Sequence, residues 1–249
     1  MIELPQVGCV IAVFSGKGGV GKSTVSANLA VALTQLGEQV GLFDADLHGP
    51  SIPKLMGVSE RPRLDGGKMQ PQVRHGVKTM SVGLLVEADE PLIWRGPMIS
   101  KGINELLDTT QWGALDFLVL DLPPGTGDAQ LGLAQDVRLD GSIAVTTPQA
   151  VALDDVRRGV AAFRKLEVPV WGIVENMAYF VCPGCGEETE VFGAQHALDE
   201  AVPVLARLPL DPMVCRGGDD GVPIVSAQPQ HPASLAFKRL AAQVIEQFA

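Results

Sequence analysis

Residues 16–24 read Gly-Lys-Gly-Gly-Val-Gly-Lys-Ser-Thr and satisfy the pattern G-x-x-x-x-G-K-[ST]. The apolar run of residues 9–14 precedes this loop, and residues 23–36 follow it with apolar side chains at helical spacing. Glycines let a backbone fold tightly and turn its N–H groups inward, and a helix N-terminus adds partial positive charge. This strand–loop–helix order therefore predicts a seat for the phosphates of a nucleotide, and disfavours a glycine-rich turn without a ligand.

Each position of the loop has an expected role. We expect the following residues to bind the nucleotide: Gly16, Lys17, Gly18, Gly19, Val20, Gly21, Lys22, Ser23 and Thr24. Lys22 is expected to act in catalysis by contacting the β- and γ-phosphates, and the Ser23 hydroxyl is expected to bind magnesium. Lys17 is unusual, because a second lysine cannot easily share the phosphate seat with Lys22. It is either a catalytic residue or a solvated lysine on a loop.

The rest of the chain alternates strand and helix signals. Strand-like runs lie at residues 39–43, 77–82, 115–121, 141–146, 169–175 and 203–208. Helical patterns lie near residues 98–108, 128–137, 150–166, 194–201 and 233–248. Repeated βα units predict an α/β fold with three α/β/α layers around a mostly parallel twisted sheet. Residues 47–75 are rich in Pro, Gly and charge and are expected to be mostly loop. No long Gly/Ser linker divides the chain, so a single domain over residues 1–249 is the simplest prediction.

The charge balance narrows the class of partner. Lys plus Arg number 19 and Asp plus Glu number 29, which gives a net charge of -10 and long-range repulsion of phosphate backbones. We therefore expect no nucleic acid and no membrane partner. Residues 1–7 lack the basic region of a signal peptide, and four cysteines in a chain without a leader favour a reducing cytoplasm.

Acidic residues follow two of the predicted strands. Asp44 and Asp46 come after the second strand, and Asp121 ends the apolar strand 115–121 in the Walker B manner. Ligands of doubly wound sheets lie at the carboxyl ends of strands, so these carboxylates are expected near the phosphates. Asp121 is expected to bind magnesium through water, and residues 122–128 to form a switch loop that senses the γ-phosphate. For each acid taken singly, a helix cap is the competing interpretation.

Asn176 is predicted to end another strand. Its amide offers a donor and an acceptor, which suits the edge of adenine, and a local turn is the competing interpretation.

Cys182 and Cys185 flank a Pro-Gly pair, which is typical of a knuckle that brings two thiolates toward one point. A closed sulfur site needs four ligands, whereas Cys9 lies in a predicted buried strand and Cys215 in a predicted loop. Two chains that each contribute the pair would complete the site on a two-fold axis. A [4Fe–4S] cluster and zinc both fit thiolates, and the sequence also allows a redox pair or two free surface thiols.

These motifs together resemble the Mrp/ApbC family of ATP-dependent iron–sulfur cluster carriers, which is related to MinD and ParA. The resemblance covers nearly the whole chain and depends on residues 16–24, 44–51, 93–98, 120–128 and 174–186. The first of these motifs is shared with MinD and ParA. The Trp-Arg-Gly-Pro segment that begins at Trp94 and the cysteine knuckle separate this family from them.

The resemblance implies several roles. Lys17 would act in trans across a homodimer, Asp46 would orient the attacking water, and Asp44 would support the nucleotide site. Asn176 would contact the base, and the Cys-x-x-Cys segment would be an insertion at about residues 178–192. It also implies slow ATP hydrolysis without a partner and transfer of a [4Fe–4S] cluster from a donor to apoproteins.

Two further functions stay open. One is a MinD/ParA-like positioning switch that binds membrane or DNA, and the second is the same ATPase with structural zinc at the cysteine pair. Because the first strand begins within ten residues of Met1, we expect neither the additional N-terminal domain of many bacterial members nor the N-terminal four-cysteine site of some eukaryotic ones.

Overall fold

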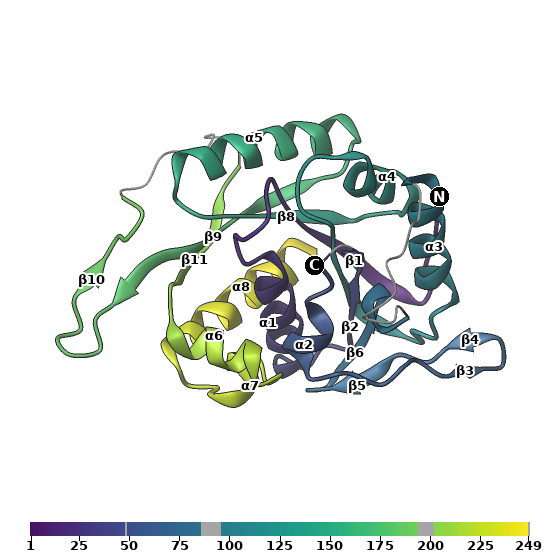
Figure 1. Ribbon diagram of the computed structural model, residues 1–249, viewed down its shortest axis with the longest axis horizontal. Helices are drawn as coiled ribbons and strands as arrows, with labels where there is room; N and C mark the ends of the chain where they lie inside the picture. The colour runs from purple at the N-terminus through teal and green to yellow at the C-terminus, as the bar shows by residue number, and fades with distance from the viewer. Residues whose placement is uncertain (48, 86–95, 194–201, 249) are drawn as a thin grey trace.

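The computed structural model describes residues 1–47, 49–85, 96–193 and 202–248. Its nine-stranded sheet has the order β10-β9-β8-β1-β7-β2-β6-β5, with β11 paired to β9 (Figure 1). The strands are β1 (Val7–Ser15), β2 (Val40–Asp44), β5 (Gln72–Arg74), β6 (Val77–Ser81), β7 (Leu115–Asp121), β8 (Gly141–Thr146), β9 (Val170–Val181), β10 (Glu188–Thr189) and β11 (Val204–Pro209). Among the described strands of this sheet, all pairings are parallel except β5 with β6 and β10 with β9, so the prediction of a mostly parallel sheet is confirmed.

Helices cover both faces of the sheet. They are α1 (Lys22–Gln35), α2 (Ile52–Met56), α3 (Gly96–Thr109), α4 (Asp128–Asp136), α5 (Ala150–Lys165), α6 (Pro212–Asp219), α7 (Ile224–Ala227) and α8 (Pro232–Phe248), with a 3-10 turn, η1 (Val82–Leu84). Cys9, Ile11 and Val13 of β1 belong to the core with α1 and α8, whereas the alternate residues Val10, Ala12 and Phe14 belong to the core with α3, α4 and α5. This alternation places one apolar core on each side of the sheet, as the three-layer prediction requires.

Several elements differ from the sequence-based expectation. The segment predicted to be mostly loop contains α2, β5 and an exposed hairpin of β3 (Leu64–Asp65) and β4 (Lys68–Met69). The hairpin turns at Gly66 and Gly67, which adopt φ of 56° and 78°, so its signal is turn chemistry rather than an apolar run. The helix expected at residues 194–201 lies outside the described residues.

Two further corrections concern residues after the central sheet. β9 continues to Val181, beyond the strand expected at 169–175, because it leaves the sheet edge and pairs with β10. Cys215 lies on α6 rather than in a loop. The Asp211 side chain accepts a hydrogen bond of 2.7 Å from Met213 N and Pro212 occupies the first turn, so a capping Asp and a Pro start this short helix.

A stacked aromatic pair in one core gives a test of the packing. Phe14 and Phe163 stack with ring centroids 4.1 Å apart, and both rings are fully buried. We expect Phe163→Ala to lower the free energy of unfolding by about 3–5 kcal/mol, because the cavity cannot fully collapse. Phe248→Ala is the matched control: its ring meets Phe117 edge-on but is 44% exposed, so a loss of about 1 kcal/mol is expected. Urea unfolding measures both, and equal losses would contradict this account.

Candidate nucleotide and cysteine sites

The phosphate loop lies between β1 and α1, at the carboxyl edge of the sheet. Gly19 and Gly21 have φ of 81° and 83°, a conformation that side chains rarely adopt. A Cβ on Gly16 would lie 2.3 Å from the carbonyl carbon of Asp155, so the start of the loop packs directly on the backbone of α5. Glycine is therefore needed at Gly16 for space and at Gly19 and Gly21 for conformation.

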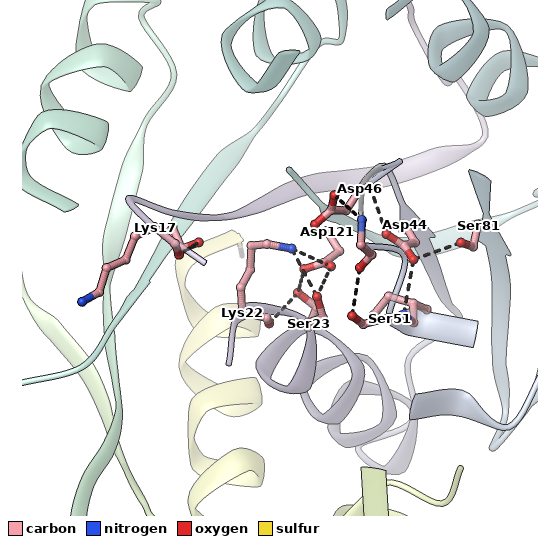
Figure 2. A network of polar contacts seen from close by, with 12 residues as sticks. Lys17, Lys22, Ser23, Asp44, Asp46, Ser51, Ser81 and Asp121 are labelled. Carbon is pink, nitrogen blue, oxygen red and sulfur yellow. Dashed lines mark hydrogen bonds and ion pairs between the residues drawn. The ribbon is translucent and has the colours of Figure 1, made fainter. Parts of the chain in front are cut away.

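A buried carboxylate organises the end of this loop. Asp121 Oδ2 accepts hydrogen bonds from Lys22 Nζ at 2.7 Å and from Ser23 Oγ at 2.6 Å (Figure 2). Its Oδ1 accepts one from Ser26 Oγ at 2.6 Å. Asp121 is fully buried and Lys22 is 6% exposed, so the ion pair and the two hydroxyls together compensate the desolvation of the carboxylate. Sequence reasoning missed Ser26, although its position one helical turn after Lys22 predicts that it shares the same helix face.

Asp44 supports the loop that carries Asp46. Its Oδ1 accepts a hydrogen bond of 3.0 Å from Asp46 N, and its Oδ2 accepts from Ser81 Oγ at 2.9 Å and from Ile52 N at 3.3 Å. Burial, and then the charge of Asp121, raise the pKa of Asp44 to about 7. The side chain thus connects β2, β6 and the start of α2, while its direct contact with nucleotide stays a prediction.

Asp46 lines the cavity that the phosphate loop encloses. Its Oδ1 accepts a hydrogen bond of 3.1 Å from Gly49 N, and the residue is 7% exposed. Asp44 and Asp46 are only two residues apart, yet Asp44 is not among the residues that line the cavity. This separation agrees with different roles for the two acids.

The cavity has a volume of about 540 Å³, within the range of small-molecule sites. One wall is formed by residues 17–24 of the phosphate loop. The opposite wall comes from α2 and α6 and consists of Lys54, Leu55, Val214, Cys215, Gly218 and Asp219. The exposed ion pair of Lys54 and Asp219, at 2.7 Å, joins α2 to α6 at this wall. Sequence reasoning did not find the α6 wall, because it lies almost 200 residues away along the chain.

The two lysines of the loop point in different directions. Lys22 turns inward to Asp121, whereas Figure 2 shows the Lys17 side chain pointing away from that cluster. The Lys17 carbonyl accepts a hydrogen bond of 2.9 Å from Ser15 Oγ, which fixes the backbone at the start of the loop. The two lysines therefore do not compete for one seat within a chain.

Asn176 lies within β9 rather than at its end, but it marks the place where pairing with β8 stops at Glu175. Its Nδ2 donates a hydrogen bond of 2.9 Å to the Val20 carbonyl, and the residue is 7% exposed. A Cβ on Gly21 would lie 2.2 Å from this nitrogen. Asn176 therefore braces the phosphate loop from β9, and its contact with a base stays a prediction.

The cysteine pair lies on a projecting arm. We define the cysteine arm as residues 178–193, which leave the sheet with the end of β9 and return through β10 (Figure 1). Cys182 N donates a hydrogen bond of 2.9 Å to the Glu187 carbonyl, and Gly186 N donates one of 2.8 Å to the Cys182 carbonyl. Gly186 has a φ of 76°, so these contacts form a tight knuckle.

The environment of this knuckle suits a thiolate ligand. The backbone N–H groups of Cys185 and Gly184, and then the Cys185 thiol, lower the pKa of Cys182. Cys185 is exposed and Cys182 is half-buried. Burial, and then Asp140, instead raise the pKa of Cys9 to about 12, which makes Cys9 an inert core residue. Within the described ranges no three His, Cys, Asp or Glu side chains gather as a ligand set, so Cys182 and Cys185 form only part of one there.

Comparison with known proteins identifies the family. The model of the ParA family, described as NUBPL iron-transfer P-loop NTPase, matches residues 6–245. The chain belongs to this P-loop NTPase family. The predicted resemblance is confirmed, although Trp94 and Arg95 of the Trp-Arg-Gly-Pro segment that supported it lie outside the described residues.

Relatives of this NTPase family share both sequence and fold with the chain. An iron–sulfur cluster carrier protein of Aquifex aeolicus is 49% identical over 254 residues, which cover 98% of this chain and 70% of that protein. The structure of a nucleotide-binding protein of Archaeoglobus fulgidus in complex with ADP has a TM-score of 0.79 and 38% identity, and the match covers 93% of this chain and 92% of that one. The cell division ATPase MinD of Pyrococcus furiosus has a TM-score of 0.75 and 26% identity over 97% of this chain and 100% of its own.

The buried ion pair gives a prediction about stability. Lys22→Met would leave Asp121 without its cation, so we expect the free energy of unfolding without nucleotide to fall by roughly 3–5 kcal/mol. Lys17→Met makes the same chemical change on the lysine that points away and should cost about 0.5 kcal/mol or less. Urea unfolding of the two variants measures the difference. Indistinguishable midpoints would show that Lys22 does not stabilise Asp121.

The raised pKa of Asp44 gives a prediction about pH. Because the folded-state pKa lies above the unfolded value, the folded protein binds more protons between the two values, and this carboxyl destabilises the fold increasingly as pH rises from about 4 to about 7. Asp44→Asn lacks this carboxyl, so its free energy of unfolding minus that of the unsubstituted protein should be larger at pH 8 than at pH 5. Chemical unfolding at the two pH values measures it, and the opposite order would contradict the raised pKa.

Proposed function

We propose that the protein is a cytoplasmic ATPase that, as a homodimer, carries a [4Fe–4S] cluster between Cys182 and Cys185 of both chains and transfers it to apoproteins. The observation that carries the proposal is a cysteine pair on a projecting arm of a P-loop NTPase fold, in which Cys185 is exposed and the half-buried Cys182 has a lowered pKa. The name of the Aquifex aeolicus relative, an iron–sulfur cluster carrier protein, supports it.

For ATP, we propose that residues 16–24 hold the phosphates with their N–H groups and that Lys22 turns from Asp121 to the β- and γ-phosphates. Ser23 Oγ and Asp121 fit a magnesium ion, because these hard oxygen donors lie 2.6 Å apart at the end of the loop, with Asp121 acting through water. When bound, magnesium offsets charge on the phosphates. The ADP complex of the Archaeoglobus fulgidus neighbour supports nucleotide binding.

For hydrolysis, we propose that Asp46 orients a water molecule whose oxygen attacks the γ-phosphorus. The bond from that phosphorus to the β–γ bridging oxygen breaks, and ADP and phosphate leave. Lys17 of each chain would act on the nucleotide of the other, in accord with its outward direction in Figure 2. Since this group must come from a second chain, hydrolysis would be slow until two chains pair.

For the cluster, the two-fold axis of a homodimer would bring four thiolates to one cargo. The lowered pKa of Cys182 increases the fraction of thiolate that can bind iron. A cargo on an exposed arm is accessible both to a donor and to an apoprotein. Binding and hydrolysis of ATP would shift the dimer between a state that holds the cluster and one that releases it.

A MinD/ParA-like positioning switch has less support. Leu240 and Val244 of α8 are fully buried against the core, so this face is not a lipid anchor. No helix among the described residues combines the length and hydropathy that a bilayer span requires. The metal analysis described below distinguishes structural zinc at the cysteine pair from an iron–sulfur cluster.

Metal analysis of anaerobically reconstituted protein tests the shared cluster. We expect about four iron and four sulfide per two chains with a brown chromophore, because each chain supplies half of the thiolates. Cys182→Ala should lose the chromophore and keep ATP binding. The matched control is Cys9→Ala, which removes a thiol from the buried core and should keep both.

Three outcomes would contradict the proposal. They are a full chromophore in Cys182→Ala, a strictly monomeric protein with full iron content, and bound zinc without iron.

A further inference from the structure

One arginine connects the surroundings of the two sites. Arg207 of β11 donates from Nε to Glu175 Oε2 at 3.1 Å and from Nη2 to Glu190 Oε1 at 2.8 Å. Glu175 lies in β9, directly opposite Arg207 in the sheet, and its side chain is 3% exposed. Glu190 lies on the returning part of the cysteine arm, just after β10, and its side chain is 41% exposed. The guanidinium therefore bridges the sheet and the arm.

On the sheet side, this bridge lies next to the phosphate loop. Glu175 precedes Asn176, whose amide donates to the Val20 carbonyl and packs within 2.2 Å of the position of a Cβ on Gly21. A change in the backbone of the loop around Val20 must therefore displace Asn176 or break its hydrogen bond. Glu175 and Asn176 are adjacent in β9. Arg207, which is hydrogen-bonded to the Glu175 side chain, is therefore connected to the strand segment that carries Asn176.

On the arm side, the strand is irregular where the arm begins. Met177 has a φ of 54°, and the register between β9 and β11 shifts between the pairs Arg207–Glu175 and Pro209–Tyr179. Bulges of this kind redirect a strand. Among the described strands, only the short β10 pairs with the outer part of the arm, so the orientation of the knuckle depends on contacts at its base, of which Arg207–Glu190 is one.

We propose that Arg207 is a positioning residue that couples the orientation of the cysteine arm to the state of the phosphate loop, through Glu190 on one side and Glu175–Asn176 on the other. This inference deepens the proposed function and rests on it for its purpose, since a carrier needs its nucleotide to affect its cargo site. An arginine suits the task because its planar fork donates to two carboxylates at once, which the single ammonium of a lysine does less well.

The two carboxylates differ in burial, so substituting them has different consequences for stability. Removing Arg207 or Glu175 leaves a buried or half-buried charge without its partner, which destabilises the sheet itself. Glu190→Gln instead removes the charge at the exposed end, where at most a neutral hydrogen bond to Arg207 remains, and Arg207 keeps Glu175. This variant therefore weakens the connection to the arm while the phosphate loop and its contact with Asn176 stay intact.

The readout is the alkylation rate of Cys182 in reduced full-length protein from which iron and zinc have been removed. Mass spectrometry of the peptide that contains Cys182 measures this rate. Iodoacetamide is applied with and without saturating Mg·ADP, which fills the loop without the γ-phosphate. We expect the nucleotide to change the rate at least about threefold in the unsubstituted protein and less than about 1.5-fold in Glu190→Gln. Glu190→Asp, which keeps the charge, should restore part of the response.

Glu187→Gln is the matched control, because it removes an exposed carboxylate from the same arm and should keep the full response. The proposal is overturned if the unsubstituted protein shows no nucleotide effect, if Glu190→Gln responds fully, or if Glu187→Gln loses the response as well. Iron loading of the same preparations separates the two hypotheses. Glu190→Gln should bind iron like the unsubstituted protein, and failure of both to load would contradict the carrier function while leaving the alkylation result to decide the coupling.

Discussion

The hydrogen bonds that Asp121 accepts hold the nucleotide site together. A carboxylate that is fully buried at the end of β7 would be costly alone, and Lys22, Ser23 and Ser26 of α1 compensate it. This constraint fixes the first turn of α1 against the central strands, and so fixes where the phosphate loop must close. The same groups that stabilise the fold are those to which we assign the nucleotide and magnesium in the proposed function, so under that proposal binding would exchange one set of partners for another instead of creating a new site.

Asp44 and Asp46, at and just beyond the end of β2, have different surroundings: one is hydrogen-bonded within the fold and the other lines the cavity. Asp44 accepts three hydrogen bonds that connect β2, β6 and α2, whereas Asp46 is carried into the cavity. From their positions in the sequence, both were expected to lie near the phosphates of the nucleotide. Only the packing around Ser81 and Ile52 distinguishes them, because the partner groups come from distant segments of the chain.

The central sheet and the phosphate loop were predictable from sequence because their signals are local: an apolar run, a glycine pattern and helical spacing. The α6 wall was not, since it depends on a short helix whose only signal is Asp211 followed by Pro212. The arm was anticipated through its cysteines, yet the continuation of β9 and the bridging contacts of Arg207 were not. Cross-strand pairs such as Arg207–Glu175 follow from register, and a single sequence does not contain the register of parallel strands.

The topology places both sites on one strand. β9 contacts the phosphate loop through Asn176 and leads directly into Cys182, beyond the irregular backbone at Met177. A rigid, continuous strand would make the two sites move together, whereas a fully detached arm would make them independent. The structure lies between these cases. The bulge interrupts the regular pairing of β9 with β11, and Arg207 bridges the interruption by contacting Glu175 before it and Glu190 on the arm. A partly exposed ion pair suits the proposed coupling, since its strength is modest and little free energy is needed to make or break it.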